Sequence, residues 1–164
     1  MTDVRSGTAM AGWTCGSCEE LITSVEDGCV EWLATEDATG EHLTGFRLVH
    51  RQRDLPTPTC RYDQRLEFAR NQSIVEGLSL ESFVGADGLM LLLSFLAQSS
   101  ASTGEVLELA KRVQVPGYEL VRDCIQPAVT AGFFHPAISH AFPLQSEIVG
   151  VLRWAYGTSS QPAA

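Results

Sequence analysis

The chain lacks the features that would place it in a membrane or direct it out of the cell. It has no stretch of about 20 apolar residues, the length that a membrane-spanning helix needs. The most apolar run, residues 89–97, is shorter and is interrupted by Ser94, so it is expected to be a buried helix. Residues 1–7 contain no apolar segment of the kind found in cleaved signals. We therefore expect a cytoplasmic protein with no membrane partner.

Basic side chains are also scarce, and this scarcity bears on the partner. Lysine and arginine together number 11 against 20 acidic residues, which gives a net charge of −9, and Lys111 is the single lysine. A chain with this charge repels the phosphate backbone of nucleic acids. The charges are unevenly distributed, because residues 19–41 contain eight acids and no lysine or arginine, whereas residues 47–70 contain six arginines and three acids.

The arginine-rich segment has two interpretations. It can be a solvated surface that pairs with the acidic segment of the same module, which is the commoner arrangement, or it can bind a partner. The net charge makes nucleic acid a less favoured partner than protein. The candidate partner-binding residues are Arg47, Arg51, Arg53, Arg61 and Arg65, together with Arg122 on a later helix.

No recognisable catalytic arrangement is present. No serine lies in the context of a nucleophile elbow, and no phosphate-binding Gly-x-x-x-x-Gly-Lys string occurs. His135 and His140 lie near a proline and small residues, where exposed loop histidines are common. A non-catalytic role is therefore favoured.

The five cysteines favour a metal over disulfides in a reducing compartment. Cys15 and Cys18 have the Cys-x-x-Cys spacing that lets two thiolates reach one cation. Zinc prefers sulfur and imidazole nitrogen, and a returning hairpin would bring His50 and Cys60 to the first pair. Four protein ligands leave no coordination position for water, so the expected zinc is structural. Cys29 is the alternative ligand, although a lone strand cysteine is more often a buried apolar residue.

Residues 12–62 resemble zinc ribbons and related treble-clef folds, in which a Cys-x-x-Cys turn is joined to a second ligand pair across a hairpin. The sequence departs from the usual pattern, because nine residues separate His50 from Cys60 instead of two to four. The string from Trp13 to Cys18 also loosely resembles the active-site turn of thioredoxin-like oxidoreductases. That turn requires a preceding buried strand and a following long helix, and the acidic residues after Cys18 disfavour a thiolate.

Apolar periodicity predicts a β-hairpin with strands at residues 29–33 and 46–50 and a solvated loop at 34–45. Residues 51–58 contain two prolines and are expected to be irregular. A short helix is expected at residues 64–70, with Leu66 and Phe68 directed inward. Longer helices are predicted at residues 88–97, 103–113, 116–132 and 146–156. The third of these carries Cys124 on its apolar face.

Residues 103–134 resemble the helix, turn, helix and glycine-terminated exit of winged-helix domains, through a small Ala110, a hydrophobic Val115 and Gly132. The resemblance implies that the helix after the turn could enter the major groove of DNA. Its outward residues would be Tyr118, Glu119, Arg122, Asp123 and Gln126. Two acids in this set repel phosphates, so the fold is better supported than DNA binding. A simple helical packing unit is the alternative.

The sequence therefore predicts an α+β protein with a zinc-ribbon-like module at residues 12–62, a bridging segment at 63–86, a winged-helix-like helical domain at 87–157 and a flexible tail at 158–164. We expect a non-catalytic zinc-binding regulatory or adaptor protein that binds a protein or nucleic-acid assembly, with a protein partner favoured. The alternatives are a dithiol oxidoreductase that uses Cys15 and Cys18, a zinc-dependent hydrolase, and a winged-helix DNA-binding transcriptional regulator.

Overall fold

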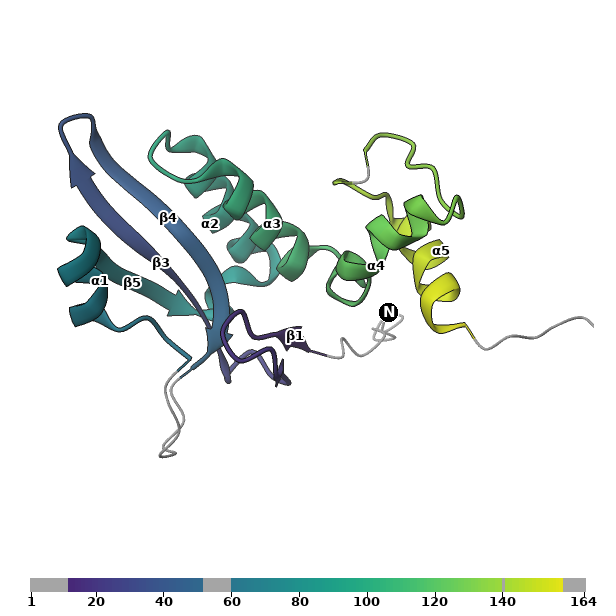
Figure 1. The fold of residues 1–164 in the computed structure, drawn as a ribbon, viewed down its shortest axis with the longest axis horizontal. Coiled ribbons are helices and arrows are strands. Elements are labelled where there is room, and N and C mark those ends of the chain that lie inside the picture. Colours follow the sequence, from purple (N-terminus) through teal and green to yellow (C-terminus); the bar gives the residue numbers. More distant parts are fainter. Residues whose placement is uncertain (1–11, 52–59, 140, 158–164) are drawn as a thin grey trace, which may run out of the picture. The chain divides into compact units, whose positions relative to one another are not determined.

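The computed structural model describes residues 12–51, 60–139 and 141–157 and has a mixed α+β architecture (Figure 1). The chain divides into two compact units, with the boundary in the sequence between Gln114 and Val115. The first unit contains β1 (Trp13–Thr14), β2 (Leu21–Ile22), β3 (Gly28–Asp37), β4 (Gly40–His50), α1 (Gln64–Asn71), β5 (Ile74–Ser79), the 3-10 helix η1 (Leu80–Phe83), α2 (Gly85–Ala97) and α3 (Thr103–Gln114). The second contains α4 (Tyr118–Thr130) and α5 (Gln145–Tyr156). The expected tail at 158–164 and most of the irregular segment at 51–58 lie outside the described residues.

β3 is the central strand of an antiparallel sheet with the order β4-β3-β5. Successive side chains of a strand point to opposite faces. On one face of β3, Val30 and Trp32 are buried. The ring of Trp32 packs against Phe95 of α2, with ring centroids 5.2 Å apart. On the other face, Glu31 is fully buried.

α2 and α3 cover the apolar face of the sheet (Figure 1). Residues of β3, β4, α2 and α3 belong to one hydrophobic cluster, which includes Trp32, Leu48, Leu92 and Val106. The two helices thus share a core with the sheet, although the sequence grouped them with the later helices. A small sheet has to bury its apolar face against another layer, and the amphipathic α3 supplies part of that layer.

The expected loop at residues 34–45 is wrong. β3 and β4 continue through this segment and are joined by a turn at Ala38–Thr39, followed by Gly40 at φ +121°. Leu43 is buried, and its backbone N–H and C=O bond to Ser100 and Ser102 in the α2–α3 connection. The polar side chains of this segment made it resemble a loop, but exposed strand positions are also polar.

β4 carries one extra residue opposite Trp32. Glu31 pairs with Arg47 and Leu33 with Thr44, so Gly45 and Phe46 together face a single residue of β3. Gly45 has φ +68°, in the left-handed region that glycine adopts at such bulges. The bulge accompanies the stacking of the Phe46 ring on Trp32, with ring centroids 5.4 Å apart.

The segment at residues 63–86, expected to be a bridge, contains the third strand of the sheet. The predicted short helix is confirmed as α1, and the carboxylate of Asp63 caps its first N–H groups. The inward orientation of Leu66 and Phe68 is wrong, because these side chains are 45% and 54% exposed. β5 was not predicted, since its apolar residues Ile74 and Leu78 are themselves exposed and do not show the pattern of a buried strand.

The second unit contains a separate small core. Its helices lie close to the predicted ranges, and α4 contains Pro127. Phe133 stacks on Trp154 of α5 at 5.8 Å between ring centroids. The buried residues of this unit are Tyr118, Val121, Ile125, Ala128, Phe134, Ile148 and Val151. In the described part of this unit no strand is present that could form a wing.

Within the described ranges, no helix combines the length and the apolar content needed to cross a bilayer.

Candidate metal centre

Cys15 and Cys18 lie in the turn between β1 and β2, which form a two-stranded antiparallel ribbon. The N–H of Cys15 donates to the carbonyl oxygen of Glu20 at 2.9 Å, and the N–H of Glu19 donates to that of Cys15 at 3.1 Å. Glu19 adopts φ +63°, an uncommon conformation for a residue with a side chain. The N–H of Gly16 donates to the carbonyl oxygen of Leu48 at 2.8 Å, which fixes the turn to β4.

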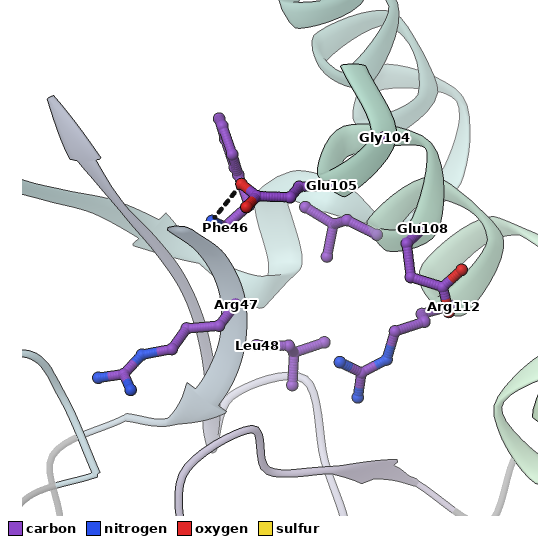
Figure 2. Close-up of a pocket in the computed structure, with 8 residues that line it drawn as sticks. Phe46, Arg47, Leu48, Gly104, Glu105, Glu108 and Arg112 are labelled. Carbon is purple, nitrogen blue, oxygen red and sulfur yellow. Dashed lines mark hydrogen bonds between the residues drawn. The ribbon is translucent and has the colours of Figure 1, made fainter. Parts of the chain in front are cut away.

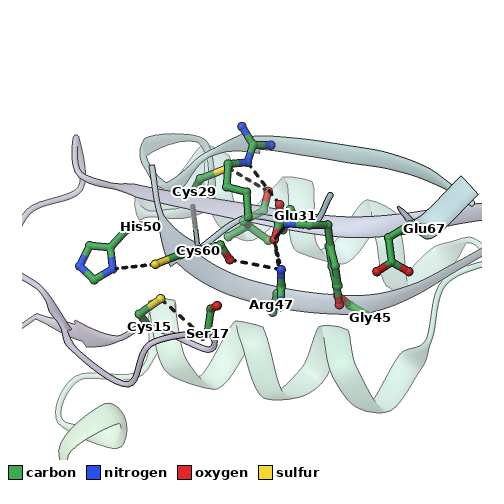
Figure 3. A network of polar contacts seen from close by, with 12 residues as sticks. Cys15, Ser17, Cys29, Glu31, Gly45, Arg47, His50, Cys60 and Glu67 are labelled. Carbon is green, nitrogen blue, oxygen red and sulfur yellow. Dashed lines mark hydrogen bonds and ion pairs between the residues drawn. The ribbon is translucent and has the colours of Figure 1, made fainter. Parts of the chain in front are cut away.

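The structure brings Cys15, Cys18, His50 and Cys60 together, and the candidate ligand atoms all lie within 4.8 Å of one another. The Sγ atoms of Cys18 and Cys60 are 3.4 Å and 3.9 Å from Nδ1 of His50. A tetrahedral ion with bonds of about 2.0–2.3 Å separates its ligand atoms by about 3.5–3.8 Å. The cluster is therefore compatible with a metal site (Figure 3 shows three of its members, Cys15, His50 and Cys60).

The ring of His50 is oriented by a second hydrogen bond. Its Nε2 lies 3.3 Å from the carbonyl oxygen of Leu21 in β2. Because a carbonyl oxygen only accepts hydrogen bonds, Nε2 is the donor in this contact, and in the neutral imidazole Nδ1 then offers a lone pair toward the thiols. Metal-binding histidines are commonly held by such a partner on the other ring nitrogen.

The thiols differ in their environment. Burial raises the pKa of Cys15, but hydrogen bonds at the backbones of Cys18, Ser17 and His50 outweigh it and lower the pKa to about 6. Burial, followed by the neighbouring Cys18 and Cys15, raises the pKa of Cys60 to about 12. Several thiols packed this closely cannot all be thiolates unless a cation compensates their charge.

Glu31 holds the segment that carries Cys60. The Glu31 carboxylate accepts from Arg47 Nη2 at 2.7 Å, from Arg61 Nε at 3.2 Å and from the N–H of Tyr62 at 3.0 Å. Arg47 also donates to the carbonyl oxygen of Cys60 at 3.2 Å, and its guanidinium lies 3.5 Å from the centre of the Tyr62 ring. Figure 3 shows this network between β3, β4 and the segment after residue 59. The buried carboxylate thus ties the fourth candidate ligand to the sheet.

α3 holds the first strand of the ribbon. Arg112, which is buried, donates from Nη2 to the carbonyl oxygen of Thr14 at 2.7 Å, and Trp13 Nε1 donates to the carbonyl oxygen of Arg112 at 3.2 Å. A cavity of about 240 Å³ between β4 and α3 is lined by Arg112 and by Glu105, whose carboxylate accepts from the N–H of Phe46 (Figure 2). These bonds join the Cys15 turn to the helical layer.

The arginines predicted to bind a partner have different surroundings. Arg47 and Arg61 are engaged by Glu31 inside the module. Arg51 and Arg65 are exposed, whereas Arg53 lies outside the described residues. Arg122 is partly buried, with its guanidinium 3.9 Å from Glu119 and 3.8 Å from Asp123. Two of the predicted partner-binding arginines, Arg47 and Arg61, are therefore engaged within the module.

Two cysteines lie outside the cluster. Cys29 is buried, with its Sγ 3.6 Å from the carbonyl oxygen of Val30. Cys124 is half-buried on α4, with its Sγ 3.9 Å from the Tyr156 hydroxyl.

Sequence reasoning missed the role of Glu31, because one acid on an alternating strand has the pattern of an exposed position. The arginine-rich segment at residues 47–70, which begins within β4, was the signal that could have revealed it.

No family model matches the chain, and no curated protein or solved structure matches it either.

Proposed function

We propose that the four-residue cluster binds one structural zinc ion and that the protein is a non-catalytic adaptor for a protein partner. The observation that carries the zinc assignment is the convergence of three thiols and one imidazole within 4.8 Å. Sulfur and nitrogen donors in a tetrahedral set favour zinc over the oxygen-preferring calcium and magnesium. Four protein ligands close the coordination sphere, so no position is left for a reacting water.

Zinc would offset the crowding of the thiols. Three thiolates and a neutral imidazole around Zn²⁺ leave one net negative charge, whereas the same thiolates without a cation repel one another. The His50 contact to Leu21 and the backbone N–H of Ser17, which lies 3.5 Å from Cys15 Sγ, supply the hydrogen bonds that usually surround such a centre.

The adaptor role is supported by the balance of charge and by the surroundings of the arginines. Arg47 and Arg61 are engaged by Glu31, so they are poorly placed to neutralise phosphates. On α4 the guanidinium of Arg122 lies close to Glu119 and to the exposed Asp123, and these acids disfavour entry of the helix into a DNA groove. A protein partner fits an acidic surface better than nucleic acid does.

Metal analysis of the purified protein tests the zinc assignment. We expect one zinc per chain, and we expect Cys60→Ala to lose it because three ligands remain. Cys29→Ala is the matched control, since Cys29 is a buried cysteine outside the cluster, and it should retain the metal. Full zinc retention by Cys60→Ala, or a metal-free protein that reduces insulin disulfides, would contradict the assignment.

A further inference from the structure

A groove at the end of the sheet away from the cysteine cluster is lined by two exposed apolar side chains and four acids. It has a volume of about 580 Å³ and is lined by residues of β3, β4, α1 and β5. The apolar side chains are Phe68 and Ile74, which are 54% and 47% exposed. Exposed aromatic and aliphatic side chains that line one concave surface are typical of binding sites for peptides or proteins.

The charges of the groove have one sign. Glu36, Asp37, Glu41 and Glu76 line it, and no lysine or arginine is among the lining residues. The carboxylate of Glu76 is fixed by Trp32 Nε1, which donates to it at 2.9 Å. Hydrogen bonds from Thr39, followed by His42, lower the pKa of Asp37 to about 2, so this carboxylate stays charged. The groove is therefore anionic at neutral pH.

Two of these acids oppose each other without compensation. Glu36 and Glu41 are direct cross-strand partners in the β3–β4 register. Like charges at such positions destabilise a strand pair. In the part of the chain that the structure describes, neither carboxylate forms an ion pair. A local rule broken in this way is expected where function requires it, and a cationic partner would relieve the repulsion.

We infer that this groove binds a basic segment of a partner protein, in which lysine or arginine residues flank an apolar side chain. The apolar residue would cover Phe68 and Ile74, and the cations would meet Glu36 and Glu41. The inference deepens the proposed adaptor function, because it names the surface and the chemistry of the partner. It is separate from the proposed metal site, because Glu41 lies nine residues along β4 from His50, roughly 30 Å in an extended strand.

The test starts from the full-length zinc-loaded protein and a phage-displayed library of random short peptides. We expect the selected peptides to be enriched in lysine or arginine next to apolar residues. The strongest binder is then synthesised with a fluorescent label, together with a copy in which its basic residues are replaced by glutamate. The copy should not bind, and added salt should weaken the parent peptide.

Variants assign the binding to the groove. Combined Glu36→Gln and Glu41→Gln should weaken the parent peptide about fivefold, and Phe68→Ala about tenfold. Glu26→Gln and Leu66→Ala are the matched controls, since both positions are exposed but do not line the groove, and they should bind normally. Thermal melting should show that the Glu36 and Glu41 changes leave stability equal or higher, because they remove a repulsion.

Several outcomes would overturn the inference. Selection of acidic peptides, selection of none, or equal binding by wild type and the Phe68→Ala protein would each do so. Calcium ions could also displace the peptide from the wild-type protein. If they did so and bound the Phe68→Ala protein equally well, the acids would be assigned to an inorganic ion instead. Zinc content, measured on the same samples, separates the two proposals: a zinc-loaded protein with no peptide binding refutes only the groove.

Discussion

At the scale of single residues, Glu31 connects the sheet to the cluster of Cys15, Cys18, His50 and Cys60. It is an acidic side chain with no exposed surface, and its oxygens accept from two guanidinium groups and one backbone N–H. Burying a charge is costly unless partners compensate it, and removing one partner leaves the others uncompensated. The network therefore contributes mainly by fixing one arrangement of β3, β4 and the Cys60 segment.

We predict that Glu31→Gln lowers the free energy of unfolding by about 3 kcal/mol, because Arg47 and Arg61 lose their common counterion. Zinc should also be released to a competing chelator faster, since the Cys60 segment is less firmly held. Denaturant unfolding and chelator kinetics measure the two effects, with the exposed Glu26→Gln as control. Stability loss with unchanged zinc release would show that Glu31 does not position Cys60.

The candidate ligands could be predicted from the sequence, but the residues that hold them could not. Cysteine spacing and ligand chemistry identified Cys15, Cys18, His50 and Cys60, because few residue types bind zinc. Glu31 and Arg112 were missed, since their roles depend on partners 16 or more residues away along the chain, such as Arg47 and Thr14. Local pattern gives no information about such pairs.

At the scale of elements, the hairpin of β3 and β4 carries the metal cluster near one end and the acidic groove at the other. Its strands were predicted from alternation, but its length was not, because the outer half, residues 34–45, contains only one large apolar side chain, Leu43. β5 was missed for a related reason: edge strands bury little, and their apolar residues remain exposed. Tertiary pairing, not local sequence, determines these elements.

The bulge in β4 gives a prediction for this hairpin. Gly45→Ala should lower the free energy of unfolding by about 1–2 kcal/mol, because alanine at φ +68° is strained and its Cβ would lie 2.9 Å from the Tyr62 hydroxyl oxygen. Denaturant unfolding of the zinc-loaded protein measures it. Gly104→Ala is a suitable control, since a Cβ there meets nothing within 4 Å. Equal stability of both variants would contradict the strain argument.

At the scale of the whole molecule, the two units have separate hydrophobic cores, so they are expected to respond differently to removal of the proposed metal. The first unit joins the ribbon, the sheet, α2 and α3 in one hydrophobic cluster, and Arg112 bonds directly to the strand before Cys15. The second unit, from residue 115 onward, has its own cluster. Loss of the proposed metal is therefore expected to disturb the first unit, including its helices.

Hydrogen exchange with and without a chelator tests this organisation. Removal of the metal should speed exchange in residues 12–50 and also in α2 and α3, because they share one core. α4 and α5 should change little. Protection of α2 and α3 that survives chelation would show that the helical layer is stable without the ribbon.

The three tryptophans are distributed so that each occupies a different environment. Trp13 bonds to the backbone of α3 beside the Cys15 turn, Trp32 packs on Phe46 and Phe95 in the sheet core, and Trp154 stacks on Phe133 in the second unit. Their intrinsic fluorescence consequently provides three natural reporters. Variants that keep one indole at a time would follow the ribbon, the sheet and the C-terminal helices optically, without any attached dye.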